Sequence, residues 1–421
     1  MQKLIVNGKK ILSGVIKVSG SKNATLPVLA ASLLSEKKIE IKGVPLVKDV
    51  ITMCHLLKYM GSNIKLNTNS KKIFIENKNK KIKNIAPYSF VKTMRAGVIV
   101  LGSLLAKFGK AKVSLPGGCA IGTRPIDVHL FGLKKLGAKI KIKNGYILAE
   151  AKKGLKGTKI KFPSISVGAT QNVIIASSLA KGTTYLKNCA CEPEIKNLTN
   201  FLKAMGIKIK WVKKREIKII GNQKLKPVKH HVMFDRIEAG TFIIAGALSS
   251  RKLKILGLET KILKTELGVL KKMGVKMKIG KNEITVLNSK KIKPVSIKTE
   301  PYPGFPTDLQ AQIMVLMTKA NGNSKIKENI FENRFMHVPE LNRMGAKIKT
   351  SGSTSVIFGP QDLNGAEVMA TDLRASVSLI LAGLIANEKT IINRVYHLDR
   401  GYESIEKKLR NCKAKISRVH N

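Results

Sequence analysis

The sequence predicts an α/β protein of two domains, each built from three copies of one unit of about seventy residues. Three observations lead to this prediction. The chain has 421 residues, which is too many for one ordinary hydrophobic core. A glycine-containing motif recurs along the chain, and an apolar helix recurs at the same spacing. Because a TIM barrel needs eight shorter β/α units, six long units argue against that fold.

The first repeated element is a helix that ends near a glycine and is followed by a strand. Successive glycines of the first five copies are 76, 69, 68 and 71 residues apart, and Lys413 takes the same place another 68 residues on. Glycine tolerates the left-handed conformation that ends many helices, so we expect an amphipathic helix, a left-handed residue and an alternating strand. Lys413 should adopt this strained conformation or end its helix differently. The copies are residues 56–65, 133–142, 201–210, 269–278, 340–349 and 408–417.

The second repeated element is an apolar helix rich in small residues. It is apolar most of the way round, so we expect it to be buried, and a short strand-like run follows it. Each unit is therefore predicted as buried helix, strand, exposed helix, glycine, strand and strand. Three units per domain divide the chain evenly, with a break near residues 229–235. The buried helices are expected at residues 24–35, 95–107, 169–180, 238–249, 308–320 and 372–386.

Polar side chains lie near the start of every buried helix. Helix N-termini carry unpaired N–H groups and a partial positive charge, so six such ends facing one cleft would bind anions. The residues also fit ordinary N-caps, and for Asp235 and Thr307 both interpretations stay open. Capping explains Lys22, Arg95 and Arg374 poorly, because a cation opposes the helix dipole. These three residues are therefore functional candidates.

The formal net charge of +52 has two interpretations. One is binding to nucleic acid, and the other is A/T-rich codon usage, which favours Lys, Ile and Asn together. The basic residues are spread evenly, with nine in residues 1–50, eleven in 201–250 and ten in 372–421. Aromatic residues make up 5%, so base-stacking platforms are scarce. We favour the second interpretation and expect no specific nucleic-acid partner.

The N-terminus has no apolar run of signal-peptide length, and the longest apolar stretches, such as residues 375–386, are too short to cross a bilayer. We therefore expect a cytoplasmic protein without a membrane partner. Its five cysteines should be reduced thiols. Cys189 and Cys191 lack the spacing of a zinc knuckle, and His230 and His231 stand apart from any carboxylate cluster. We expect neither a metal nor a cofactor.

A glycine-rich segment at residues 115–125 (LPGGCAIGTRP) contains Cys119 and Arg124. A thiol in a glycine-rich, cationic loop is positioned to be acidic and reactive. Most lone cysteines, however, are small buried hydrophobic residues, and the local composition leaves both interpretations open.

The longest motifs closely resemble the UDP-N-acetylglucosamine 1-carboxyvinyltransferases, a family of enolpyruvyl transferases in the EPSP synthase-like superfamily. The resemblance runs in one register from about residue 3 to residue 418. It implies two inside-out α/β barrel domains, each of three βαβαββ units, comprising residues 22–231 and residues 1–21 plus 232–421. The motifs are residues 19–29, 88–96, 115–129, 166–172, 235–242, 305–312, 331–341, 370–376 and 397–403.

The resemblance implies transfer of the enolpyruvyl group of phosphoenolpyruvate to the 3′-hydroxyl of UDP-N-acetylglucosamine, with release of phosphate. This is the first committed step of peptidoglycan synthesis. Cys119 matches the family's general acid, which can also form a covalent adduct with phosphoenolpyruvate, so fosfomycin is expected to label it. Asp308 matches the carboxylate that holds and deprotonates the sugar hydroxyl, and Lys22 and Arg400 complete the catalytic set.

The remaining family positions bind the two substrates. Phosphoenolpyruvate is expected at Lys22, Asn23, Arg124, Arg374 and Arg400. UDP-N-acetylglucosamine is expected at Arg95, Arg124, Pro125, Ile126, Asp127, Val128, Ser164, Ile165, Ser166, Val167, Asp308 and Ile330. Ser164 stands where the family often has lysine, so one expected cation at the diphosphate is missing. Cys191 stands where the family often has arginine.

Three alternatives compete with this interpretation. The sister enzyme transfers the same group to shikimate 3-phosphate, but it resembles neither the Cys119 loop nor the segment RPIDVH at 124–129. A nucleic-acid-binding protein would require clustered basic residues and stacking aromatics. A degenerate copy without activity is disfavoured because every expected catalytic position is filled.

Overall fold

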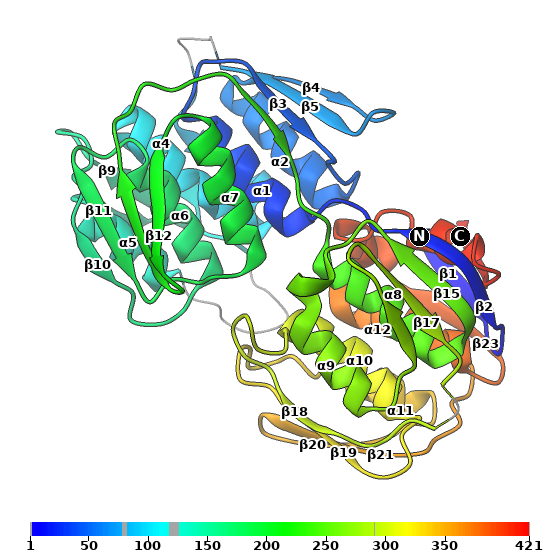
Figure 1. The fold of residues 1–421 in the computed structure, drawn as a ribbon. Coiled ribbons are helices and arrows are strands. Elements are labelled where there is room, and N and C mark those ends of the chain that lie inside the picture. The colour runs from blue at the N-terminus through cyan, green and yellow to red at the C-terminus, as the bar shows by residue number, and fades with distance from the viewer. Residues whose placement is uncertain (1, 78–81, 118–125, 290, 421) are drawn as a thin grey trace. The chain divides into compact units, whose positions relative to one another are not determined.

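The computed structural model describes residues 2–77, 82–117, 126–289 and 291–420. These residues form two compact units, coloured along the chain in Figure 1. Unit 1 comprises residues 2–19 and 234–420, and unit 2 comprises residues 20–117 and 126–233. Each unit has its own hydrophobic core. Within the described ranges, no helix has the length and apolar character needed to cross a membrane.

Unit 2 contains three four-stranded sheets and the helices that pack on them. Its strands are β3 (Ile39–Lys42), β4 (Asn63–Asn67), β5 (Lys72–Glu76), β6 (Ile85–Ala86), β7 (Lys110–Ser114), β8 (Lys139–Lys143), β9 (Tyr146–Glu150), β10 (Lys159–Lys161), β11 (Thr183–Lys187), β12 (Lys208–Lys213), β13 (Glu216–Ile220) and β14 (Val228–His231). Its helices are α1 (Lys22–Ser32), α2 (Lys48–Met60), α3 (Tyr88–Val91), η1 (Arg95–Ile99), α4 (Val100–Phe108), α5 (Asp127–Lys135), α6 (Val167–Ser177) and α7 (Pro193–Ala204).

Unit 1 repeats this architecture with three more four-stranded sheets. Its strands are β1 (Gln2–Asn7), β2 (Leu12–Lys17), β15 (Ser250–Leu256), β16 (Met277–Ile279), β17 (Glu283–Leu287), β18 (Ser296–Lys298), β19 (Ser324–Lys327), β20 (Lys347–Ser351), β21 (Thr354–Phe358), β22 (Glu367–Met369), β23 (Lys389–Asn393) and β24 (Lys415–His420). Its helices are α8 (Arg236–Ser249), η2 (Thr260–Leu263), α9 (Lys264–Lys272), η3 (Thr307–Leu309), α10 (Gln310–Met317), α11 (Val338–Arg343), α12 (Leu373–Ile385), η4 (Val395–Arg400) and α13 (Ile405–Arg410).

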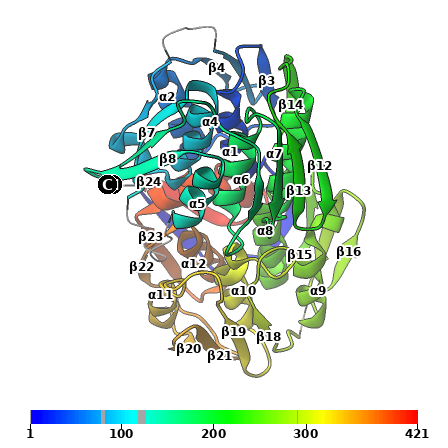
Figure 2. The same ribbon diagram turned by 90° about the vertical axis from the view of Figure 1, so that its left-hand side faces the viewer.

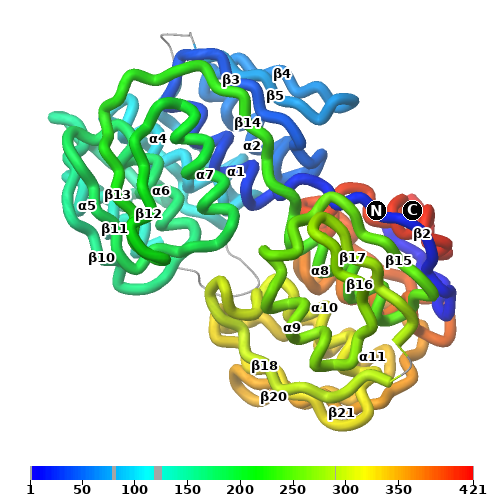
Figure 3. Tube along the Cα trace, viewed as in Figure 1, coloured from blue at the N-terminus to red at the C-terminus, as the bar shows by residue number. Residues whose placement is uncertain are grey.

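Each of the six sheets combines one parallel strand pair with two antiparallel pairs. In the order β14-β3-β5-β4, for example, β14 runs parallel to β3, and the other pairs are antiparallel. The N-terminal strands complete unit 1, because β2 pairs with β15 and β1 lies between β23 and β24. The two chain ends therefore lie side by side in that unit (Figure 3).

The apolar repeated helices form the core of each unit, as expected from their composition. In unit 2, α1, α4 and α6 pack against one another with the sheets outside them (Figure 2). In unit 1, the same arrangement is made by α8, α10 and α12. The structure differs from the expected continuous helices at residues 95–107 and 308–320, where 3₁₀ turns (η1 and η3) precede α4 and α10.

The six repeated helix ends are confirmed as one backbone motif. The five glycines have φ between 82° and 108°, and Lys413 adopts the same left-handed conformation with φ of 72°. After each left-handed residue, the next N–H donates to a leucine carbonyl five residues back, as from Ser62 to Leu57 and from Ala414 to Leu409. This bond is typical of a Schellman cap. Lys413 therefore accepts the backbone strain rather than ending its helix in another way.

Candidate active site

In unit 2, the cation expected at the start of α1 is neutralised by a carboxylate. Ser21 caps α1 by accepting a hydrogen bond from the Ala24 N–H (3.2 Å), and Lys22 is the first helical residue, followed by Asn23. Lys22 Nζ lies 3.1 Å from Asp49 Oδ2, and both side chains are largely buried. Asp49, in the first turn of α2, offsets the unfavourable position of Lys22 against the helix dipole.

Two groups of the expected nucleotide residues lie at the starts of adjacent helices in unit 2. Ile126 precedes α5, which begins with Asp127 and Val128. Ser164 and Ile165 precede Ser166, which caps α6 by accepting from the Ala169 N–H (3.3 Å), and Val167 is the first residue of that helix.

His129 and Gly168 hold these two helix starts together. A Cβ at Gly168 would lie 2.9 Å from the His129 ring, so glycine permits the close approach. His129 Nδ1 also lies 3.2 Å from Asn172 Nδ2 of α6. Two helix N-termini, each with a partial positive charge, are thereby placed side by side, an arrangement that favours a bound anion.

The structure says less about the remaining expected residues of unit 2. Arg95 is the first residue of η1, preceding the buried helix α4. Cys119, Arg124 and Pro125 lie outside the described residues.

In unit 1, the carboxylate of Asp308 is held between two buried arginines. Asp308 Oδ1 accepts from Arg334 Nη2 and Oδ2 accepts from Arg374 Nη2, each at 2.7 Å. The arginine side chains are 4% and 8% exposed, whereas Asp308 is 28% exposed. The carboxylate is therefore the part of this cluster that solvent or a ligand reaches more easily.

Arg374 has further partners that fix its position. It follows Asp372, which caps α12 by accepting from the N–H groups of Arg374 (2.7 Å) and Ala375 (3.3 Å). Arg374 Nη1 donates to the hydroxyl of Tyr402 at 3.3 Å. Burial is the largest single influence on the pKa of Arg374 and lowers it, but the Asp308 charge, Tyr402 and the hydrogen bond to Asp308 together hold the pKa above its ordinary value. The guanidinium is therefore charged at every physiological pH.

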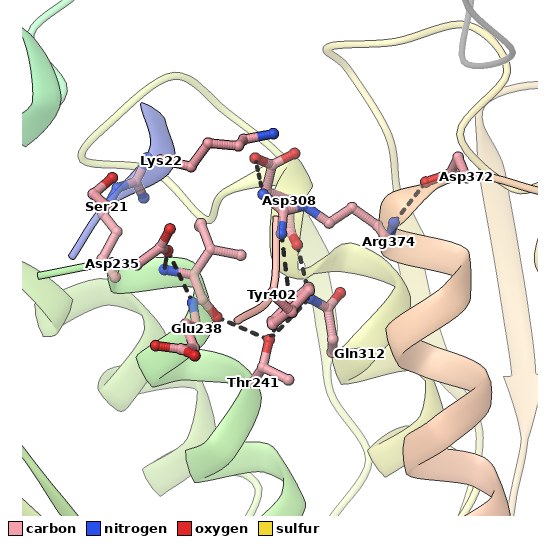
Figure 4. A network of polar contacts seen from close by, with 12 residues as sticks. Ser21, Lys22, Asp235, Glu238, Thr241, Asp308, Gln312, Asp372, Arg374 and Tyr402 are labelled. Atoms are coloured by element: carbon pink, nitrogen blue, oxygen red, sulfur yellow. Dashed lines mark hydrogen bonds and ion pairs between the residues drawn. The ribbon is translucent and has the colours of Figure 1, made fainter. Parts of the chain in front are cut away.

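A network of buried polar side chains lies next to Asp308 and Arg374 (Figure 4). Gln312 Nε2 donates to the Asp308 carbonyl at 2.9 Å, and it also lies 3.2 Å from Thr241 Oγ1 and 3.3 Å from the Tyr402 hydroxyl. The hydroxyls of Thr241 and Tyr402 are 2.9 Å apart. Because Tyr402 also contacts Arg374, the network joins the first two turns of α8, α10 and α12.

Glu328 connects Ile330 to the start of η3. Its Oε1 accepts from the Ile330 N–H at 2.8 Å, and its Oε2 accepts from the Thr307 hydroxyl at 3.0 Å. Of the two open capping assignments, Asp235 is confirmed as the cap of α8. The capping interpretation of Thr307 is wrong, because Pro306 occupies the cap position and the Thr307 hydroxyl is used by Glu328.

Arg400 is the last residue of η4, two positions before Tyr402. Burial and then the Arg400 charge lower the pKa of the neighbouring His397. The segment that supplies Tyr402, a contact of Arg374, therefore also supplies the cation Arg400.

Several residues of these clusters carried no expected role. Asp49, Arg334, Gln312, Glu328 and Tyr402 were not singled out, although three of them lie within the quoted motifs. Among the described residues, no three His, Cys, Asp or Glu side chains are grouped as metal ligands.

Comparison with known proteins gives three consistent results. The family model described as EPSP synthase (3-phosphoshikimate 1-carboxyvinyltransferase) matches residues 6–409. The chain is 61% identical to a UDP-N-acetylglucosamine 1-carboxyvinyltransferase of Pelagibacter ubique (strain HTCC1062) and 50% identical to one of Geotalea uraniireducens (strain Rf4), with 100% of each chain covered.

Solved structures share the fold at lower identity. The enolpyruvyl transferase NikO from Streptomyces tendae superposes with a TM-score of 0.91 at 23% identity, covering 99% of each chain. An EPSP synthase from Acinetobacter baumannii gives a TM-score of 0.76 at 18% identity, covering 100% of each chain. Both structural likenesses concern the fold alone.

Proposed function

The chain belongs to the EPSP synthase family, and we propose that it transfers the 1-carboxyvinyl group of phosphoenolpyruvate to the 3′-hydroxyl of UDP-N-acetylglucosamine, releasing phosphate. The observation that carries this proposal is the full-length identity of 50–61% to relatives named for this activity. The identity to the EPSP synthase structure is only 18%, so shikimate 3-phosphate is disfavoured as the acceptor. The product would enter peptidoglycan synthesis, and a cytoplasmic location fits its soluble substrates.

The reaction adds the sugar oxygen to C2 of phosphoenolpyruvate while C3 gains a proton. A proton is then lost from C3 and phosphate from C2. This elimination restores the carbon–carbon double bond and leaves the product as an enol ether. We assign Asp308 as the group that holds and deprotonates the 3′-hydroxyl. Arg374 and Arg400 would bind the anionic groups of phosphoenolpyruvate, for which planar guanidinium forks are well suited.

The double pairing of Asp308 affects how it would act as a base. Two guanidiniums at 2.7 Å stabilise its charged form and so weaken its basicity. An anionic substrate would compete with Asp308 for Arg374. Drawing this cation toward the substrate would take one of the two guanidiniums away from the carboxylate and make it a stronger base.

The proposed roles in the rest of the chain follow the family positions. Lys22 and Arg124 would neutralise the transferred phosphate, Asn23 would contact both substrates, and Cys119 would protonate C3. Arg95, Arg124, Pro125, Ile126, Asp127, Val128, Ser164, Ile165, Ser166, Val167, Asp308 and Ile330 would contact the sugar nucleotide. The side-by-side starts of α5 and α6 support the part of this assignment that falls on residues 126–128 and 164–167.

We also propose the domain division at residues 22–231 and residues 1–21 plus 232–421. The unit boundaries after residues 19 and 233 support it. The chemistry described needs no metal or cofactor, because side chains supply the acid, the base and the cations.

Phosphate release tests the proposal directly. Purified protein is incubated with phosphoenolpyruvate and either UDP-N-acetylglucosamine or shikimate 3-phosphate, and the products are examined by mass spectrometry. We expect phosphate release and a carboxyvinyl product only with the sugar nucleotide. Turnover of shikimate 3-phosphate alone, or of neither acceptor, would overturn the proposal.

A further inference from the structure

Tyr402 occupies a central position in the network behind Asp308 and Arg374, and its hydroxyl is buried there. Its oxygen contacts three groups among the described residues: Thr241 Oγ1 at 2.9 Å, Arg374 Nη1 at 3.3 Å and Gln312 Nε2 at 3.3 Å. Two of these groups, the guanidinium and the amide nitrogen, can only donate hydrogen bonds. Thr241 is therefore the acceptor available for the Tyr402 proton.

The Thr241 hydroxyl confirms this direction independently. Its proton is used by the carbonyl of Ile237, one turn back in α8, at 2.8 Å. The Thr241 oxygen is consequently an acceptor toward Tyr402, and the Tyr402 proton points to it. The lone pairs of the Tyr402 oxygen are then directed at Arg374 and Gln312.

Gln312 is oriented by the backbone of Asp308. Its amide nitrogen must face the Asp308 carbonyl at 2.9 Å, because the opposite orientation would place two oxygens together. The second hydrogen of this NH₂ group is shared between Thr241 and Tyr402. One amide thus ties the main chain of Asp308 to the hydroxyl that contacts Arg374.

We propose that Tyr402 is a positioning residue for the reaction, acting through Arg374, and that Thr241 and Gln312 hold its hydroxyl as a fixed acceptor. This inference rests on the proposed function, because it assigns Arg374 to phosphoenolpyruvate. The fixed acceptor keeps the guanidinium oriented when Asp308 no longer pairs with it. Burial raises the pKa of Tyr402, so the hydroxyl remains protonated throughout the working pH range.

The consequence is specific to one substrate. Loss of the hydroxyl removes a hydrogen bond to a charged group, and such bonds contribute more than neutral ones. A less ordered Arg374 would weaken the stabilisation of phosphoenolpyruvate and of the charge that develops on it. The sugar nucleotide would bind nearly as before.

The first test is Tyr402→Phe, compared with wild type and with Tyr185→Phe. Tyr185 lies exposed on β11 in unit 2 and provides the same chemical change away from the network. In steady-state phosphate release, we expect kcat/KM for phosphoenolpyruvate to fall about tenfold or more in Tyr402→Phe, from the loss of one charge-assisted hydrogen bond. KM for UDP-N-acetylglucosamine should stay within about twofold.

The second test separates the hydroxyl of Thr241 from its packing, and it remains decisive if Tyr402→Phe does not fold. Thr241→Val keeps the shape but removes the oxygen, whereas Thr241→Ser keeps the oxygen but removes a buried methyl group. We expect Thr241→Val to lose at least about threefold in kcat/KM for phosphoenolpyruvate, because a buried donor is left unsatisfied, and Thr241→Ser to stay near wild type. A residue that acts only by packing would give the reverse order.

The outcomes are distinguishable from failure of the proposed function. Inactive wild-type protein would remove the proposed function and this inference together. Active wild type with a Tyr402→Phe variant as efficient as Tyr185→Phe would overturn the positioning role alone. A parallel loss for both substrates, or Thr241→Ser as impaired as Thr241→Val, would also overturn it.

Discussion

Arg374 and Asp308 form an ion pair, with Nη2 2.7 Å from Oδ2, although they are 66 positions apart in the sequence. The other carboxylate oxygen pairs with Arg334 at the same distance. One partly exposed carboxylate is therefore shared between two buried guanidiniums in unit 1. Both the stability of the cluster and its proposed chemistry depend on this sharing.

Asp308→Asn should lower the stability of the protein as well as its activity. It leaves two buried arginines without their shared anion, which should cost about 2 kcal/mol or more, less than a fully buried pair because Asp308 is partly exposed. Asp362→Asn is the matched control, since Asp362 pairs with Lys319 at the surface. Denaturant unfolding measures both, and equal midpoints for the two variants would contradict the prediction.

Fosfomycin should label Cys119 alone. Burial raises the pKa of Cys54 to about 11 and of Cys189 to about 12, and it also raises the pKa of Cys191 and Cys412. These four thiols carry little thiolate at neutral pH and should be inert. Mass spectrometry of the digested protein should find one equivalent on the peptide containing Cys119, and label on another cysteine would refute the assignment. Cys119→Asp should escape labelling and keep part of the activity, because a carboxylic acid can still donate a proton.

Arg400→Ala should lower kcat by about 10²-fold or more, because catalysis depends steeply on the position of the charges that hold the substrate. Arg410→Ala serves as the control, since Arg410 is exposed on α13. The phosphate-release assay compares the two variants. Similar rates for both would show that Arg400 has no special part in the reaction.

Lys413→Gly should stabilise the protein, since glycine adopts the left-handed conformation of residue 413 without strain. The gain should be roughly 0.5–1 kcal/mol after the entropy cost of glycine. Gly137→Ala is the converse change at the same place in the second repeat, where a Cβ would meet no atom within 4 Å. It should destabilise by about 1 kcal/mol through backbone strain alone. Thermal unfolding of both variants checks the signs, which must be opposite.

Stability should fall between pH 6.5 and pH 4 because of the partly buried His230 and the buried His337. Burial lowers the pKa of His230 from 6.5 to about 4, and it does the same for His337. The unfolded chain takes up protons below pH 6.5 while the folded protein does not, so this stabilisation is complete above pH 6.5 and is lost as the pH falls. Each histidine can contribute up to about 3 kcal/mol.

His230→Gln should therefore flatten the pH dependence of the free energy of unfolding. His55→Gln should leave it unchanged, because His55 is exposed on α2. Denaturant titrations at pH 7 and pH 5 provide the comparison. An unchanged slope in His230→Gln would contradict the prediction.

Much of the fold could be predicted from the sequence because its signals are local. Helices that are apolar on every side must be buried, and α6 and α12 are buried along nearly their whole length. The helix caps were equally predictable, since a left-handed residue is required whatever surrounds it. Even Lys413 follows this rule, which shows that the repeated backbone motif outweighs the preference of a single residue.

The family could also be recognised from contiguous motifs, and the comparisons confirm it. Many of the expected site residues lie at or near helix starts, whereas Arg400 ends η4 and Ile330 lies outside the helices. The contacts between these residues, in contrast, could not be predicted from the motifs. No spacing pattern indicates that Asp49 neutralises Lys22. Nor does one indicate that the Thr307 hydroxyl donates to Glu328 instead of capping its own helix.

The sequence by itself determined the repeated unit, its buried helices, its left-handed caps and the family. The tertiary structure alone decided which charges meet: Arg334 and Arg374 at Asp308, and Tyr402 behind them. The physical reason is the distance along the chain over which each kind of interaction acts. Backbone conformation and burial depend on neighbours along the chain, whereas an ion pair or a shared proton depends on side chains that only the packing of distant helices brings within 3 Å or so of one another.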